Sequence, residues 1–173
     1  KGEISYATGG IAVGSHLAGE LFKLRAGVDL VNVPYKGAPQ ATTDVVAGQV
    51  LLSFSTMPTA LPLVKAGKLR ALGVTTANRV QGMPEFPAIS ETLPGFDVRT
   101  WQGLLAPAKT PEAIVAKLHD SALKALKLPD IREKLSAQAY EPVGNTPKDF
   151  GALIVKEIGM WREVVTAAKI EAM

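Results

Sequence analysis

The stretch ISYATGGIAVGSHLAGELF, residues 4–22, decides the fold. Ile4–Thr8 predicts a short strand, and the glycines after it turn the chain into an amphipathic helix over Val13–Leu24. Three interpretations of such a glycine-rich turn compete: a phosphate-binding loop, a nucleophile elbow, or a helix N-terminus that holds an anion without reacting with it.

The same alternation of strand and helix continues along the chain. Strands are expected at Leu30–Val33, Val50–Phe54 and Leu69–Val74, and helices at Pro39–Ala47 and Pro58–Ala66. Connections this short predict an α/β fold, a parallel sheet with helices on its faces. With the strand order 2-1-3-4, ligands would bind at the switch point between the first and third strands.

The regular alternation of strand and helix patterns ends after Thr75. Residues 82–97 are rich in proline and glycine and predict a long ordered loop or linker, and VRTWQGLLAP, residues 98–107, predicts another strand. The remaining residues predict helices, which are Pro111–Leu126 with Thr110 as N-cap, Pro129–Gln138, and a last helix that starts at Pro147 with Thr146 as N-cap.

Composition and charge exclude several classes of function. The chain has 173 residues, of which 47% are apolar and 20% charged, as expected for a globular core. The net charge of +3 is spread without a basic stripe, so no nucleic-acid partner is expected. Cysteine is absent and the only histidines are His16 and His119, so we expect no metal site and no cofactor.

Two of the three interpretations of the first loop fail on its residues. Gly9 and Gly14 have the spacing of a Walker A loop, but Ser15 stands where the phosphate-binding lysine is needed. Ser15 is not in a Gly-x-Ser-x-Gly elbow. Neighbouring helix residues also point about 100° apart, so Ser15 and His16 do not form a nucleophile and its base.

An anion-binding helix N-terminus remains. The backbone N–H groups of Gly10, Ile11, Ala12 and Val13 would point out of the helix, where its dipole favours an anion such as a carboxylate. Purely structural roles stay open as alternatives: the glycines would serve only a tight turn, and His16 would only pack or cap the helix locally.

Five stretches carry a family resemblance. They are ISYATGG…GSHLAGELFK, VNVPYKGAPQATTDVVAGQV, MPTALPLVKAGKLRALGVTTANR, TWQGLLAPAKTP and EPVGNTPKDFGALIVKEIGMW. In order and spacing they resemble the Bug/TctC family, the extracytoplasmic solute-binding proteins of tripartite tricarboxylate transporters. The resemblance implies a two-lobed, type II periplasmic-binding-protein fold. Residues 1–98 would be one complete ligand-binding lobe, and residues 99–173 the crossover strand and C-terminal helices of another, truncated lobe.

The resemblance also implies a site. Its ligand-binding residues would be Thr8, Gly9, Gly10, Ile11, Ala12 and His16 at the first loop, with Tyr35, Lys36, Gly37, Ser55 and Thr56 lining the cleft. Ser55 departs from the aspartate often found there in the family, and Thr8-Gly9 departs from a frequent Ser-Gly.

The implied function is the capture of a small carboxylate (a dicarboxylate, tricarboxylate, amino acid or aromatic acid) for membrane permease subunits, without catalysis. Family members usually carry a signal peptide and a further stretch of chain before Lys1. We therefore expect an exported, periplasmic protein of which this chain is a fragment that associates with itself. The alternatives are an enzyme acting on a phosphorylated or acyl substrate, and the effector-sensing lobe of a transcription regulator.

Overall fold

The computed structural model describes residues 4–81 and 83–170, so Gly82 of the proline-rich segment lies outside the described residues. The chain divides into two compact units. Unit 1 comprises Lys1–Thr100 with Trp161–Met173, and unit 2 comprises Trp101–Met160.

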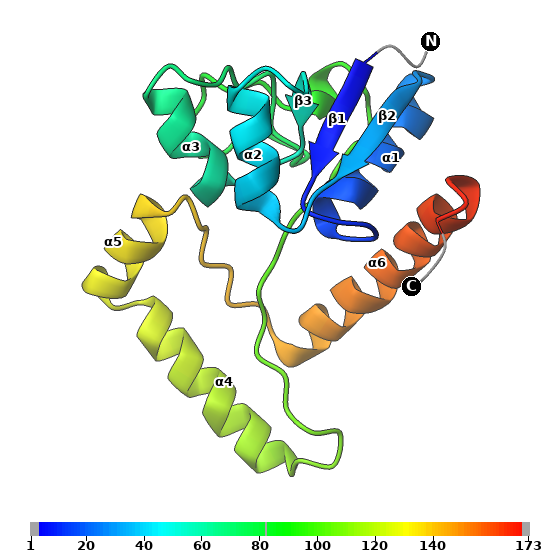
Figure 1. The fold of residues 1–173 in the computed structure, drawn as a ribbon. Coiled ribbons are helices and arrows are strands. Elements are labelled where there is room, and N and C mark those ends of the chain that lie inside the picture. The colour runs from blue at the N-terminus through cyan, green and yellow to red at the C-terminus, as the bar shows by residue number, and fades with distance from the viewer. Residues whose placement is uncertain (1–3, 82, 171–173) are drawn as a thin grey trace. The chain divides into compact units, whose positions relative to one another are not determined.

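Unit 1 is built on a parallel sheet of three strands (Figure 1). These are β1 (Ile4–Thr8), β2 (Leu30–Pro34) and β3 (Leu52–Ser53), in the order β2-β1-β3. Both neighbours run parallel to β1, with Ala7 opposite Val33 on one side and opposite Ser53 on the other. The predicted α/β class and the predicted order of the first three strands are confirmed.

Each strand leads into a helix. The helices are α1 (Gly14–Ala26), α2 (Ala38–Val46) and α3 (Met57–Lys65). Gly27 ends α1 as predicted, because its φ of 63° belongs to the left-handed region that glycine adopts without strain.

The central strand shows why helices cover both faces of the sheet. Successive strand residues point to opposite faces. Tyr6 packs toward α1, where its hydroxyl donates to Glu20 at 2.7 Å, whereas Ala7 belongs to a buried cluster with Ala41 of α2 and Val50. Helices α1 and α2 therefore cover opposite faces of β1 (Figure 1).

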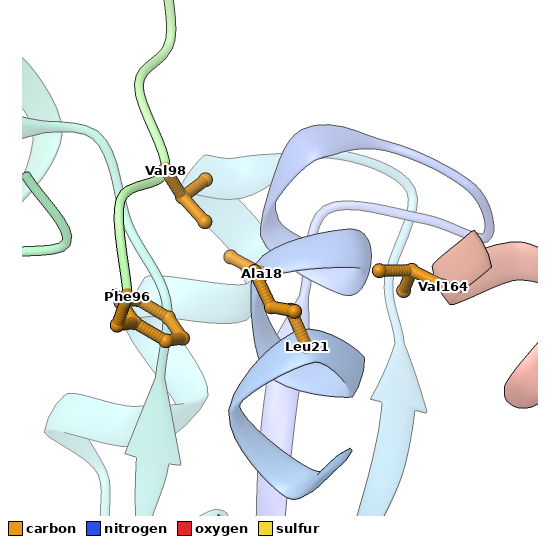
Figure 2. Packing of buried hydrophobic residues seen from close by; sticks show 5 residues of the cluster. All are labelled: Ala18, Leu21, Phe96, Val98 and Val164. Carbon is orange, nitrogen blue, oxygen red and sulfur yellow. The ribbon is translucent and has the colours of Figure 1, made fainter. Parts of the chain in front are cut away.

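The main core lies on the α1 side. Ala18 and Leu21 of α1 pack between Phe96 and Val98 on one side and Val164 on the other (Figure 2). Phe96 is only 1% exposed, so the proline-rich segment that contains it is part of the core as well as a connection.

The predicted fourth strand, Leu69–Val74, is wrong. The backbone N–H of Val74 donates to Pro87 at 2.8 Å, and its carbonyl accepts from Ile89 at 3.0 Å. Val74 therefore forms a single parallel bridge with Ala88 and does not extend the sheet beyond β3. Leu72, which lies within the predicted strand, is 65% exposed.

Two other expected strands differ from the structure. The predicted strand Val50–Phe54 shortens to β3. Leu51 is 66% exposed, so this segment of the chain is not covered on both faces of the sheet. Residues 98–107 form no strand, which corrects the predicted crossover strand. Within that stretch Leu104 and Leu105 are 82% and 77% exposed, so they have none of the packing that would hold a strand in a sheet.

Unit 2 consists of helices. They are α4 (Glu112–Leu126), α5 (Pro129–Ala137) and α6 (Pro147–Ala167), the last of which continues into unit 1. The prediction of Thr110 as N-cap of α4 is wrong, because Pro111 takes that position. Thr146 caps α6 as predicted, since its hydroxyl oxygen accepts the Asp149 N–H at 3.1 Å.

Candidate anion-binding site

The carboxyl ends of three parallel strands place three loops at one edge of the sheet. Strands β1, β2 and β3 end at Thr8, Pro34 and Ser53, and the helices that follow start at Gly14, Ala38 and Met57. Every predicted site residue lies in these connections, at the end of β1 or in the first turn of α1. Open parallel sheets bind their ligands outside this edge.

The first two loops are joined to each other. The backbone N–H of Tyr35 donates to the carbonyl of Thr8 at 2.9 Å. A Cβ atom on Gly9 would lie 3.0 Å from the backbone nitrogen of Ala38, tighter than ordinary packing allows. Gly9 is therefore needed for a close approach between two loops, in addition to any role in the turn.

The polar side chains of the first loop are turned into the loop itself. The Thr8 hydroxyl lies 3.1 Å from the carbonyl oxygen of Gly10 and 2.8 Å from Asn32 Oδ1. The Ser15 hydroxyl accepts the Gly9 N–H at 3.2 Å. These contacts fix the backbone from within, so the groups left for a ligand are main-chain N–H groups.

His16 is also turned inward. Its Nδ1 accepts the Ala12 N–H at 3.0 Å, and its Nε2 lies 3.8 Å from Glu20 Oε1. Burial lowers the pKa of His16 against the opposing pull of Glu20, and Lys23 lowers it further. A neutral imidazole is therefore favoured at this position.

The buried carboxylate of Glu20 has two further partners. It accepts from Tyr6 Oη at 2.7 Å and from Lys23 Nζ at 2.9 Å. Burial, and then the hydrogen bond to Glu20, raises the pKa of Tyr6 above its ordinary value. Sequence reasoning missed Glu20 and Asn32; the four-residue spacing of His16 and Glu20 on one helix face is the signal that could have found the first.

The second loop contains an exposed lysine, Lys36, and a tyrosine, Tyr35, whose hydroxyl is already hydrogen-bonded. The Tyr35 hydroxyl donates to Asp44 of α2 at 2.7 Å, and this bond raises the pKa of Tyr35. Lys36 is exposed, and Gly37 precedes α2 with a φ of 134° that favours glycine. In the third loop Ser55 is exposed, and the Thr56 hydroxyl pairs with Thr59 at 3.1 Å. The structure thus joins the first two loops, whereas the hydroxyl of Thr56, the residue before α3, is engaged by Thr59 of that helix.

Three helix N-termini meet this edge without a neutralising side chain. No N-cap side chain of α1, α2 or α3 accepts a hydrogen bond from a backbone N–H of its helix, and none of these helices has an acidic residue in its first turn. By contrast, α4, α5 and α6 carry Glu112, Asp130 and Asp149 in their first turns. The unpaired N–H groups and aligned dipoles favour an anion at the edge where α1, α2 and α3 begin.

Two searches of the part of the chain that the structure describes gave negative results. Residues 4–81 and 83–170 contain no group of three or more side chains that could hold a metal ion. No helix within those ranges is long and apolar enough to cross a membrane.

Solved structures define the class of protein. The Rpa4515 protein of R. palustris with adipate superposes with a TM-score of 0.86 at 34% identity, over 99% of this chain and 58% of that chain. MatC of Rhodopseudomonas palustris with bound malate gives 0.77 at 32% identity, over 95% and 57%. The periplasmic binding protein BugD gives a TM-score of 0.81 at 31% identity, over 99% of this chain and 58% of that chain, so the fold is that of periplasmic binding proteins.

The sequence comparison gives the family. Residues 1–170 match TctC, the tripartite tricarboxylate transporter family receptor, and the chain belongs to this family. It is 35% identical over 173 residues to the protein of the tcbD–tcbE intergenic region of Pseudomonas sp. (strain P51), covering 99% of this chain and 52% of that protein. The chain thus spans about half the length of this relative. The family is one of transporter receptors and not of enzymes.

Proposed function

We propose that the sheet edge of unit 1 binds a small dicarboxylate, and that the chain serves a transporter of the tripartite tricarboxylate type as part of its solute receptor. The observation that carries the proposal is the set of three uncapped, acid-free helix N-termini at one sheet edge. A carboxylate can accept several backbone N–H bonds there without any reacting group. Adipate and malate, bound by two structural relatives, name the ligand class to test.

The predicted site residues make up the three loops of the proposed binding surface. They are Thr8, Gly9, Gly10, Ile11, Ala12 and His16 of the first loop, and Tyr35, Lys36, Gly37, Ser55 and Thr56 of the other two. Thr8 and His16 are buried and support the first loop from within. Lys36 is exposed in the second loop, where its charge can steer a dianion. We also propose that residues 99–173 belong to a second lobe, that permease subunits receive the solute, and that the protein acts in the periplasm.

Calorimetric titration of the 173-residue chain with adipate and with malate tests the proposal. We expect saturable binding that weakens as salt is added, because the attraction is largely electrostatic. Adipamide has the same length without the charges and serves as the control ligand, for which no binding is expected. Equal heats for adipate and adipamide, or none for either diacid, would reject the sheet edge as a carboxylate site.

The same chain is expected to associate with itself through unit 2. None of the residues 101–160 is buried. Large apolar side chains of this unit are at least half exposed, namely Leu104, Leu105, Ile114, Leu118, Leu128, Val143, Val155 and Ile158. Exposed apolar surface on this scale usually marks an interface, and a specific contact between two copies would bury more than about 1,000 Å².

Sedimentation velocity over a concentration series measures this association. We expect a dimer or larger species that gives way to monomer on dilution. Replacing Leu104 and Leu105 together by glutamate should shift the equilibrium toward monomer while leaving unit 1 folded. A single monomeric species at every concentration would contradict the prediction.

A further inference from the structure

The contact between His16 and Ala12 holds a strained part of the first loop. Ala12 has a φ of 57°, a left-handed conformation that is unfavourable for a residue with a side chain. Its N–H points to His16 Nδ1 at 3.0 Å. Since a backbone N–H can only donate, Nδ1 must be the acceptor, and the ring must be unprotonated at that atom.

The other side of the imidazole faces the protein interior. His16 is 7% exposed and Nε2 lies 3.8 Å from the carboxylate of Glu20, which is itself 7% exposed. The charged and titratable groups that face the ring are Glu20 and Lys23 from α1, and Tyr6 of β1 reaches the same carboxylate. With one nitrogen engaged by the loop and the other turned to Glu20, little of the ring is left for a ligand.

We propose that His16 is a positioning residue whose neutral imidazole holds Ala12, and with it the β1–α1 loop, in the shape that presents its N–H groups to the ligand. Protonation of Nδ1 replaces the acceptor by a donor that faces the Ala12 N–H. The contact is then lost, the strain at Ala12 is released, and the cationic ring is drawn toward Glu20. The assignment concerns the loop itself, and only its effect on affinity rests on the proposed function.

The pH dependence has a defined sign. Burial favours the neutral ring, so the folded-state pKa of His16 lies below the ordinary 6.5. The contact is therefore fully present above pH 6.5 and is lost as the pH falls through the lower folded-state pKa. Loop order and diacid affinity should fall together over that acidic window. Because the second carboxyl of adipate also takes up a proton there, the ligand-free loop shifts are the readout that decides the proposal.

Three variants of the full chain separate positioning from ligand contact. In His16→Asn the side-chain oxygen takes the place of Nδ1 and cannot be protonated, whereas His16→Gln places its amide near Nε2 and leaves Ala12 without an acceptor. His16→Ala removes both. The first readout needs no ligand: amide ¹H–¹⁵N shifts of Ala12 and its neighbours, with the ring ¹⁵N shifts of His16, followed between pH 7.5 and pH 4.5.

The expected results are specific. The wild-type ring should be the Nε2–H tautomer, and the Ala12 amide should move with the apparent pKa of His16. His16→Asn should keep the Ala12 shift and abolish its pH dependence, and His16→Gln and His16→Ala should shift residues 9–13 even at pH 7.5. Adipate affinity should follow the same order, falling about tenfold in the Gln and Ala variants, which corresponds to ~1.4 kcal/mol.

Two results would contradict the positioning role of His16. If His16→Gln keeps the wild-type loop shifts while His16→Asn loses them, or if the Ala12 amide ignores the titration of His16, the positioning role is wrong. Circular dichroism at each pH shows whether the variants are folded. If a variant is unfolded, the pH titration of the Ala12 amide in the wild type provides the test instead. Absence of adipate binding in every protein would reject the proposed function and leave the shift experiment valid.

Discussion

Replacing Gly19 by alanine is expected to lower the free energy of unfolding by about 2–3 kcal/mol. A Cβ atom at this position would overlap Tyr6 Cε2 and lie 2.6 Å from Tyr6 Cζ. The ring cannot move aside easily, because Tyr6 is fully buried and its hydroxyl is bonded to Glu20. Urea denaturation followed by circular dichroism measures the change.

Gly159 of α6 provides the matched control. It is also a glycine inside a helix, but a Cβ atom there would meet no other atom within 4 Å. Alanine should therefore stabilise that helix by up to about 1 kcal/mol, through its higher helix propensity. If both substitutions changed stability in the same direction, the contact with Tyr6 would not be what requires glycine at position 19.

The first part of the fold could be predicted because local signals mark each boundary. Gly27 ends α1 through its left-handed conformation, and Pro39 and Pro58 stand in the first turns of α2 and α3, where a proline fits. Short connections between these elements then require parallel strands. The order β2-β1-β3 follows from placing the second and third strands on either side of the first.

The errors arose where partners distant in the sequence decide the structure. The apolar run at 69–74 looks like a strand, but Val74 pairs with Ala88 and not with β3. That pairing belongs to the folded proline-rich segment, which Phe96 anchors in the core. Likewise, Leu104 and Leu105 fit a strand pattern and find no sheet in unit 2. A hydrophobic pattern predicts that a segment is buried, but it does not predict which other segment the buried face packs against.

The candidate site was predictable in place and less so in detail. Parallel strands end at one edge, so the pattern of strands and helices is enough to group the three loops. The direction of the side chains does not follow from that pattern, since it depends on single hydrogen bonds. Thr8, Ser15 and His16 bond to their own loop, and the Tyr35 hydroxyl bonds to Asp44. The sequence shows which polar groups a loop contains. The packing of the loop determines whether these groups form hydrogen bonds within the loop or remain free for a ligand.

Replacing Gly10 by aspartate is expected to weaken adipate binding by roughly 2–4 kcal/mol, which is about 30- to 1,000-fold. Gly10 stands in the loop before α1 with a φ of 152°, and its Cβ position is 3.6 Å from the Val13 side chain and 3.7 Å from the Tyr35 carbonyl. A carboxylate at this position would compete for the same N–H groups and repel an approaching diacid. Calorimetry with adipate at pH 7 gives the loss.

Gly10→Asn separates the charge from the backbone strain, because asparagine has nearly the same shape and meets the same unfavourable φ. We expect it to bind adipate more weakly than the wild type but much better than Gly10→Asp. Both variants carry the strain at position 10, but Gly10→Asp should be more stable than Gly10→Asn, since a negative charge near the start of α1 interacts favourably with the helix dipole by about 0.3–1 kcal/mol. If Gly10→Asp is the more stable of the two variants and the weaker binder, the positive end of α1 is a binding element and not only a turn. Equal affinity for Gly10→Asp and Gly10→Asn would remove the dipole of α1 from the site.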